Sequence, residues 1–447
     1  MAMGKAKLVP LYLTEMNERE VGEYQVQMGK LHEFYDDVAE FLEPVKFGDP
    51  VPEEADAAVF VLLLGAVYSK VDYLKGLNLP FIVLTSRFGT VEMWDWEIIS
   101  YLRDKGLNVF SPYNVELGKV IIRAIGLKTQ LKSGVKFLMF QDDPGEGMQP
   151  NIFKKFYWWE KEATQTMHDT FGMNLIYKSW KKLAADAKEV PDEEAAAVCA
   201  DWNINKAPDL TERAYLSAVK LYIAAKREIE AEGNVVGIGC NCLNESMYAD
   251  TTPCLAWNML FERDGIIFAC EGDTLTLLSN YLIHGSLKSS FMMTNVYPFL
   301  VGMAALAHEK IDHFPDIPDP ANHALGVHCG YFGLVARQFC TEWTLRPKAL
   351  EIVDENAIVV DCRLPMGPAT LAKINANMKE ITVIAAEIED YVQYPGSDCR
   401  NGALIRYNNG HSVMEGLSSH HAIIMSGDHV PELMQMAKVF GFKVTLL

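Results

Sequence analysis

Residues 266–276 read IIFACEGDTLT and join two different apolar patterns. The apolar run before Glu271 predicts a buried strand, and the periodic run TLTLLSNYLIHG after Asp273 predicts a helix. Both carboxylates should therefore lie at the carboxyl end of a strand, where open α/β sheets bind their ligands. They are two residues apart on an extended turn and can face the same way. Together they can bind a divalent cation or move a proton beside one.

Asp273 also fits a purely structural role. It directly precedes the predicted helix, where an aspartate accepts hydrogen bonds from the free backbone N–H groups of the first turn. Both interpretations of Asp273 stay open at this point. Glu271 has no comparable local role, so its position favours a function.

The N-terminal part of the chain alternates between strand-like and helix-like segments. Buried strands are predicted at LVPLYLT, AAVFVLLL, LPFIVLTS and VKFLMFQ, with helices around residues 18–43, 92–106 and 114–128. This alternation predicts a parallel sheet with helices on its faces. The turn-rich sequence DDPGEGMQP follows, and we therefore assign residues 1–148 to a first α/β domain.

A second α/β domain is predicted over residues 149–285 and contains the Glu271 segment. It has a long helix at LTERAYLSAVKLYIAAKREIEAEG, then the strand NVVGIGCN, a helix over residues 251–265 and the strand IIFAC. GNVVGIG lacks the third glycine that opens the helix of a phosphate-binding loop. We interpret its glycines as sites of close backbone packing.

The pattern changes again after residue 286. Short strand-like segments separated by turns predict a mostly β domain over residues 286–447, such as a small barrel. The segment HHAIIMSGDHVPELMQMAKVFGFKV predicts a strand, a helix with Pro431 near its first turn, and a last strand. The predicted fold class is thus α/β, with two Rossmann-like domains that carry parallel sheets and a mostly β C-terminal domain.

Composition and charge exclude several classes of protein. A chain of 447 residues with 49% hydrophobic and 22% charged residues is typical of a globular protein with more than one core. The formal net charge of −19 argues against binding to nucleic acid or to an anionic membrane surface. The longest apolar runs are shorter than the roughly 20 residues that cross a bilayer. Nine cysteines without a CxxC pair, and no visible targeting segment, predict reduced thiols and a cytoplasmic protein.

Further polar residues gather in the C-terminal part. His420 and His421 are adjacent in a strand-like segment and should point to opposite faces, so at most one is expected to reach a shared site. Arg400 lies in a turn before the strand ALIRY, where it can hold a hydroxyl, phosphate or sulfonate group or form a surface salt bridge. The aromatic segment FKKFYWWEKE, which begins at Phe153, suits sugar stacking, a core contact or a subunit contact.

These residues together resemble the L-fucose isomerase and L-arabinose isomerase superfamily of aldose–ketose isomerases. The Glu-x-Asp-x-Leu motif of the fucose enzymes is matched by EGDTL at residues 271–275. About 24 residues later the family has a second metal-binding carboxylate, where this chain has Asn295. The C-terminal order of histidine, strand, helix and strand is matched from His420 onwards, with His421 in the ligand position.

The resemblance covers roughly residues 230–447, and only the alternating pattern supports it before that. HALGVHCG resembles the arabinose-type segment that supplies a further histidine, so His323 or His328 is a candidate. Asn295 departs from the family, because an amide oxygen can ligate a hard cation but has no charge and cannot act as a base.

The resemblance implies a metal-dependent aldose–ketose isomerase. A divalent ion (Mn²⁺, or another such as Mg²⁺ or Co²⁺) would be held by Glu271, Asn295 and His421. Glu271 and Asp273 would move the proton through a cis-ene-diol. The candidate substrate-binding residues are His328, His323, Arg400 and His420.

The resemblance also implies the substrate class and the assembly. The substrate would be a sugar or an anionic derivative such as a phospho- or sulfo-sugar, with no nucleic-acid or membrane partner. The protein would be a homo-oligomer, which in this family is a hexamer whose neighbouring N-terminal domain helps to close the site. A sugar epimerase on the same scaffold and a non-catalytic sugar-binding homologue are the alternatives, and Asn295 favours the second of these.

Overall fold

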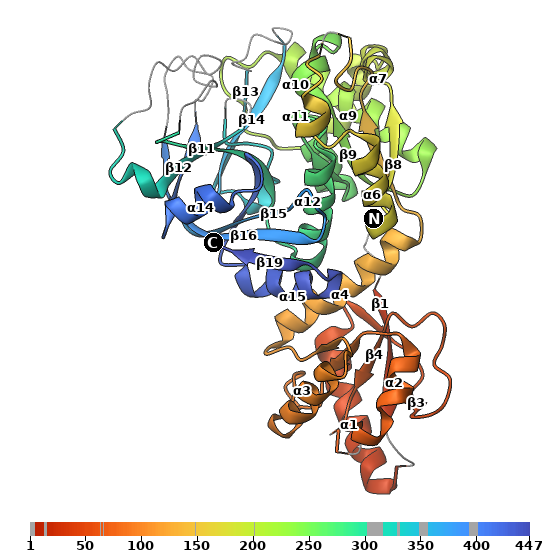
Figure 1. Ribbon diagram of the computed structural model, residues 1–447. Helices are drawn as coiled ribbons and strands as arrows, with labels where there is room; N and C mark the ends of the chain where they lie inside the picture. The colour runs from red at the N-terminus through yellow and green to blue at the C-terminus, as the bar shows by residue number, and fades with distance from the viewer. Residues whose placement is uncertain are drawn as a thin grey trace.

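The protein folds into two parallel α/β units and an antiparallel barrel (Figure 1). The computed structural model describes residues 5–12, 16–62, 64–65, 67–147, 149–200, 202–301, 316–328, 331–347, 356–392 and 401–447. The prediction of an α/β fold with a mostly β C-terminal part is confirmed.

The first sheet contains six parallel strands in the order β2-β1-β4-β5-β6, with β3 paired to the end of β1. Its strands are β1 (Ala6–Tyr12), β2 (Ala39–Phe41), β3 (Val45–Lys46), β4 (Ala57–Phe60), β5 (Phe81–Val83) and β6 (Val109–Phe110). The helices of this unit are α1 (Glu18–Tyr35), α2 (Val71–Leu77) and α3 (Trp96–Asp104), with short 3₁₀ turns η1 (Val67–Lys70) and η2 (Met93–Asp95). Strands such as β4 and β5 are apolar and buried along their whole length, because helices cover both faces of a parallel sheet.

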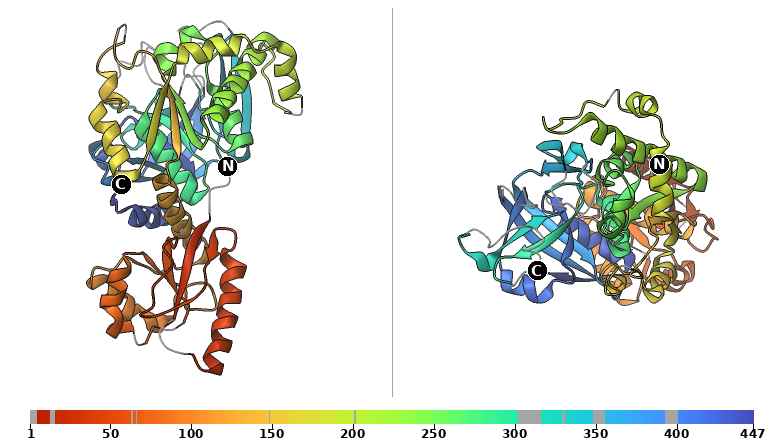
Figure 2. Two further views of the ribbon diagram at one scale, coloured as in Figure 1. Left: turned by 90° about the vertical axis from the view of Figure 1, so that its right-hand side faces the viewer. Right: turned by 90° about the horizontal axis from the view of Figure 1, so that it is seen from above.

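Helix α4 (Val115–Lys132) leads from the first sheet to the second. It packs against α12 and α15 of the rest of the protein as well as against β1. Figures 1 and 2 show the first unit standing apart from the other two units, with α4 at the junction.

The second sheet has four parallel strands in the order β10-β9-β7-β8. These are β7 (Lys136–Phe140), β8 (Asn174–Lys178), β9 (Val235–Cys240) and β10 (Ile267–Ala269). Its helices are α5 (Phe153–Phe156), α6 (Lys161–Phe171), α7 (Trp180–Lys188), α8 (Asp192–Cys199), α9 (Glu212–Glu232), α10 (Cys242–Glu245), α11 (Cys254–Asp264) and α12 (Thr274–Leu287), with the 3₁₀ turn η3 (Ser246–Tyr248).

One strand differs from the prediction in its sheet. VKFLMFQ forms β7 as expected, but β7 pairs with β8 and β9 and so begins the second sheet instead of ending the first. The preceding α4 is 18 residues long and carries the chain out of the first unit. A local apolar pattern identifies a strand but does not say which sheet the strand joins.

The interpretation of the GNVVGIG glycines as close packing is confirmed for the two that lie in β9, but it is wrong for Gly233, where a Cβ atom would have no neighbour within 4 Å among the described residues. A Cβ atom on Gly237 would lie 2.6 Å from the Phe137 ring, and one on Gly239 would lie 2.8 Å from Met139 Cε. Large side chains of β7 therefore fill the space that these glycines leave.

The C-terminal unit is a closed antiparallel barrel. Its strands follow the order β15-β18-β11-β12-β17-β16, and β16 pairs back with β15 to close it. They are β11 (Met292–Pro298), β12 (His323–Val327), β15 (Gly367–Ile374), β16 (Glu380–Val392), β17 (Gly402–Tyr407) and β18 (His421–Ser426), and β19 (Lys443–Leu446) adds to β16 in parallel. The remaining elements are the hairpin β13 (Glu342–Pro347) and β14 (Ile358–Arg363), helices α14 (Gly410–Gly416) and α15 (Val430–Phe440), and the 3₁₀ turns η4 (Pro320–Asn322) and η5 (Arg337–Phe339).

The predicted order of strand, helix and strand after His420 is confirmed by β18, α15 and β19, with Pro431 in the first turn of α15. Of the strand-like segments predicted after residue 286, the first part of ALEIVDENAIVVDCRL, at residues 349–355, lies outside the described residues. Within the described ranges, no helix is long and apolar enough to cross a membrane. Helix α12 packs on β15 and β18, so the end of β10 and the wall of the barrel meet.

Candidate functional site

Glu271 occupies a strained turn between β10 and α12. Its φ angle is +56°, and that of Gly272 is +68°, so two successive left-handed residues turn the chain from strand to helix. A Cβ atom on Gly272 would lie 3.0 Å from the Trp159 ring, and this close contact adds to the preference of the positive φ for glycine. Glutamate seldom adopts a positive φ, and strain of about 1–3 kcal/mol at such residues gathers at functional sites.

Asp273 caps α12, as one of its two interpretations predicts. Its Oδ1 accepts a hydrogen bond of 2.7 Å from the backbone N–H of Thr276. Its Oδ2 lies 2.7 Å from Lys373 Nζ and 2.9 Å from His421 Nδ1. Both oxygens of this fully buried carboxylate are thus engaged, one by the helix and the other by two side chains.

Lys373 is a site residue that the sequence did not reveal. It lies on β15, is 3% exposed, and also donates to Thr276 Oγ1 over 2.8 Å. Burial of an ammonium group is unfavourable unless a carboxylate pairs with it, and Asp273 provides that carboxylate. Burial alone would raise the pKa of Asp273, but the charge of Lys373 and the hydrogen bond with His421 hold it below its ordinary value.

His421 joins Asp273 to Glu271. Its Nδ1 faces Asp273, and its Nε2 lies 3.4 Å from Glu271 Oε2. Burial lowers the pKa of this imidazole, but the two carboxylates outweigh burial, and the pKa is raised above its ordinary value. A histidine whose Nδ1–H is held by a carboxylate presents Nε2 as its reactive atom.

Tyr157 contacts both Glu271 and His421. Its hydroxyl donates to Glu271 Oε2 over 2.6 Å, and its ring stacks on the His421 ring with centroids 5.5 Å apart and planes at 6°. Burial first, and then the charge of Glu271, raise the pKa of the phenol. The sequence left the role of this aromatic segment open, and the structure makes it a buried contact of the site.

The segment that carries Tyr157 is fixed to the Glu271 turn. Trp159 Nε1 donates to the carbonyl of Gly272 over 2.7 Å, and the backbone N–H of Thr274 donates to the carbonyl of Tyr157 over 3.2 Å. The Tyr157 hydroxyl is therefore held at a defined place relative to the carboxylate.

His328 also reaches Glu271. Its Nδ1 lies 3.6 Å from Glu271 Oε1, and its ring meets that of His421 edge to face at 6.4 Å. Burial raises the pKa of Glu271, but His421, His328 and the hydrogen bond from Tyr157 outweigh it and lower the pKa below its ordinary value. Glu271 is thus an ionised carboxylate among groups that favour its charge.

Asn295 lies directly opposite His421 on the neighbouring strand β11. Paired residues of antiparallel strands point to the same face, so the amide and the imidazole share one side of the sheet. Asn295 Nδ2 donates to Tyr297 Oη over 3.3 Å, whereas its buried Oδ1 has no hydrogen-bond partner among the described residues.

The other predicted substrate-binding residues, His323, His420 and Arg400, are not seen in contact with Glu271 in the described part of the chain. His323 begins β12, one strand length from His328, and its imidazole lies 2.9 Å from Glu389 Oε2 and 2.8 Å from the carbonyl of Asp319. His420 is exposed beside His421, with ring centroids 4.1 Å apart, and forms the rim of the site. Arg400 lies outside the described residues.

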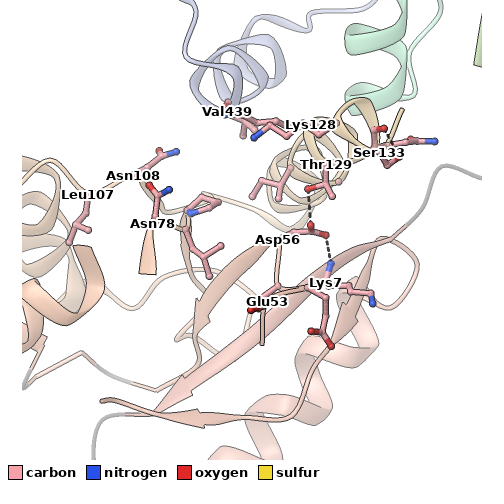
Figure 3. A pocket seen from close by; sticks show the side chains of 18 of the residues that line it. Lys7, Glu53, Asp56, Asn78, Leu107, Asn108, Lys128, Thr129, Ser133 and Val439 are labelled. Carbon is pink, nitrogen blue, oxygen red and sulfur yellow. Dashed lines mark hydrogen bonds between the residues drawn. The ribbon is translucent and has the colours of Figure 1, made fainter. Parts of the chain in front are cut away.

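A cavity of about 930 Å³ lies away from these residues, between the first unit and helices α4 and α15 (Figure 3). Asp56 at its edge accepts hydrogen bonds from the backbone of Lys7 over 2.8 Å and from Thr129 Oγ1 over 2.7 Å. This cavity faces the amino ends of the strands, opposite to the edge at which α/β sheets bind ligands. We therefore place the candidate site at Glu271.

Neither a protein-family model nor a curated protein sequence matches this chain. The chemistry must therefore be argued from the site itself. An ionised carboxylate faces an imidazole, a phenol and a second imidazole, and all four side chains are buried. Such a set can hold a cation between Glu271 and His421 or can transfer protons to and from a bound molecule.

Proposed function

We propose that this protein is a metal-dependent aldose–ketose isomerase. The supporting observation is the pair of Glu271 Oε2 and His421 Nε2, which face each other 3.4 Å apart while Asp273 orients the imidazole from behind. A carboxylate–histidine–metal arrangement has this form, and the separation suits two ligands of one ion.

Three residues would hold the ion. Glu271 and His421 supply a carboxylate oxygen and an imidazole nitrogen, and Asn295 supplies the amide oxygen that has no partner among the described residues. Within the described ranges, no three His, Cys, Asp or Glu side chains are grouped to hold a metal. A site at Glu271 therefore depends on the amide as its third protein ligand. Oxygen-rich ligands with one imidazole suit Mn²⁺, and Mg²⁺ or Co²⁺ are the alternatives.

Glu271 has the position to move the carbon-bound proton. The ion would polarise the carbonyl and hydroxyl oxygens of the substrate. Glu271 would take the proton from C2 on one oxygen and return it to C1, through a cis-ene-diol. Asp273 was predicted as the second acid or base, but both of its oxygens are engaged. We propose that Asp273 orients His421 instead.

The substrate is proposed to be a sugar or an anionic sugar derivative such as a phospho- or sulfo-sugar. A sugar epimerase on the same scaffold would share the ion and Glu271 and would differ in where the proton returns. A sugar-binding protein without activity is the remaining alternative, and the replacement of a family carboxylate by Asn295 favours it.

Proton NMR in D₂O with a panel of neutral and anionic aldoses tests these alternatives. A ketose that carries deuterium at C1, formed only with Mn²⁺, supports the isomerase. An epimer with deuterium at C2 would favour the epimerase. If no sugar reacts but sugars raise the melting temperature, the protein binds without catalysis and the proposal is wrong.

We further propose that the chain acts as a homo-oligomer, such as a hexamer, in which the first unit of a neighbouring copy covers the Glu271 site. Large aromatic side chains at the carboxyl edge of the first sheet are highly exposed, namely Phe88 (79%), Trp94 (73%), Trp96 (60%) and Tyr113 (86%). We propose these side chains as the contact surface, because large exposed apolar groups gather at interaction sites. Light scattering of the purified chain and of its Trp94→Ala variant tests this, and a monomeric wild type would contradict it.

We also propose that the two α/β units are Rossmann-like and that the protein is cytoplasmic. The order β2-β1-β4-β5-β6 changes direction beside β1, and β10-β9-β7-β8 does so beside β7, which supports two Rossmann-like units. The cysteines of the described residues are all free, which suits a reducing cytoplasm.

A further inference from the structure

An aldose–ketose conversion has to move two protons. One passes from C2 to C1, and the other passes from the hydroxyl oxygen O2 to the carbonyl oxygen O1. Glu271 is assigned to the carbon-bound proton in the proposed function, on which this inference rests. Asp273 cannot serve the oxygens, because the start of α12, Lys373 and His421 already occupy its carboxylate.

Tyr157 is placed to serve the oxygen-bound proton. Its hydroxyl lies 2.6 Å from Glu271 Oε2, the same oxygen that lies 3.4 Å from His421 Nε2. The hydroxyl therefore points to the place where a substrate would meet both groups. A phenol can donate one hydrogen bond and accept another at the same time, which neither a carboxylate nor an ammonium group can do.

We infer that Tyr157 is a further catalytic residue, whose hydroxyl passes the oxygen-bound proton of the substrate from O2 to O1. The hydroxyl exchanges its hydrogen bond with Glu271 for one with O1, gives its proton to O1 while it takes the proton of O2, and the C2–O2 bond becomes the new carbonyl. In the same conversion Glu271 carries the C2 proton to C1. No acid or base is consumed, and Tyr157 ends with the proton that O2 held.

The environment of Tyr157 suits a group that stays neutral throughout. Tyr157 is 3% exposed and its hydroxyl faces the Glu271 carboxylate, and a second negative charge is unfavourable in such a buried place. A hydroxyl that gains one proton as it loses another never has to become a phenolate. The Tyr157 ring stacks in parallel on the His421 ring, and the backbone N–H of Thr274 donates a hydrogen bond to the Tyr157 carbonyl. These two contacts hold the phenol in place for the proton transfer between O2 and O1.

The experiment compares wild type, Tyr157→Phe and Tyr35→Phe in D₂O with Mn²⁺ and an aldose that the wild type converts. Tyr35 is the matched control, because it is also buried and donates one hydrogen bond of 2.7 Å, to the Gly89 carbonyl in the first unit. In Tyr157→Phe we expect ketose formation to fall by about 100-fold or more, within the usual range for loss of acid–base catalysis. Deuterium should still enter C2 of the aldose at a rate near that of the wild type, because Glu271 is intact.

A second measurement needs no turnover. In the metal-free protein, a phenol held on an ionised carboxylate should give a proton resonance far downfield, because such hydrogen bonds are short and strong. This resonance should be present in wild type and Tyr35→Phe and absent in Tyr157→Phe. Its absence from the wild type would contradict the geometry on which the inference depends.

The outcomes separate this inference from the proposed function. If Tyr157→Phe loses exchange at C2 and ketose formation by the same factor, Tyr157 only positions Glu271 and the inference is wrong. If the variant loses neither, the hydroxyl has no part in the reaction. If the wild type itself shows neither exchange nor ketose with any aldose, the proposed function fails and the inference fails with it.

Discussion

Replacement of Lys373 by methionine removes one charge from a buried ion pair. Lys373 is 3% exposed and Asp273 is fully buried, and their charged atoms lie 2.7 Å apart. Methionine has a similar length and no charge, so it leaves Asp273 ionised and without its main partner. We expect the variant to be strongly destabilised.

The magnitude follows from the burial of both groups. Removal of one partner of a buried ion pair destabilises a protein by about 3–5 kcal/mol, because the other charge is left uncompensated. Asp273→Asn should be destabilising for the converse reason, since it leaves the ammonium of Lys373 buried alone. The double variant removes both charges and keeps an amide oxygen to cap Thr276, so most of the lost stability should return.

Urea unfolding of the wild type, both single variants and the double variant measures this coupling. We expect the double variant to be more stable than either single variant, with a coupling free energy of about 2–3 kcal/mol, in the range for residues in contact. If the losses in unfolding free energy of the two single variants sum to that of the double variant within about 0.5 kcal/mol, the two groups act independently and the reasoning is wrong.

Three further predictions concern the site. Glu271→Gln should lower kcat by about 1,000-fold or more, as expected when a proton-transferring group is removed, with little change in the melting temperature; near-normal turnover would contradict the assignment of Glu271. Asn295→Asp should tighten Mn²⁺ binding by about tenfold in calorimetric titrations, because a charged oxygen replaces a neutral one; an unchanged affinity would place Asn295 outside the ligands. The pKa of His421 is raised, so Mn²⁺ must displace a proton from the imidazole when it binds. The affinity for Mn²⁺ should therefore fall tenfold for each pH unit below that pKa and should be constant above it. Affinities measured between about pH 6 and 9 check this, and a flat profile would exclude His421 as a ligand. The same raised pKa stabilises the metal-free protein below the ordinary value of the histidine, and this contribution is lost as pH rises through the raised value.

Most strands of the fold could be predicted from local sequence. β1, β4, β5, β9 and β10 are apolar runs bounded by turns, and such runs form strands in both parallel sheets. β8 and β15 were not predicted, because β8 is only half-buried and β15 begins with glycine and proline. The path of α4 determines which sheet β7 joins, and the sequence of β7 itself does not predict it.

The candidate site was predicted in part. Glu271 was identified by its position after a strand, and His421 and His328 by the family resemblance, and the structure brings the three together. Lys373 was missed, because a single lysine in the strand GPATLAKI usually faces solvent and only the barrel closure turns it towards Asp273. His323 was also a candidate, but it begins β12 and lies five positions before His328 along an extended strand.

Glu271 and Asp273 would be conserved to different degrees in homologues that had lost catalytic activity. Asp273 begins α12, so natural selection for a stable fold would keep it even without a reaction. Glu271 has a backbone conformation that glycine or asparagine adopts with less strain, so drift would soon replace it. A glutamate at this position in related sequences is therefore a sign of continued selection for chemistry, whereas the neighbouring aspartate is not.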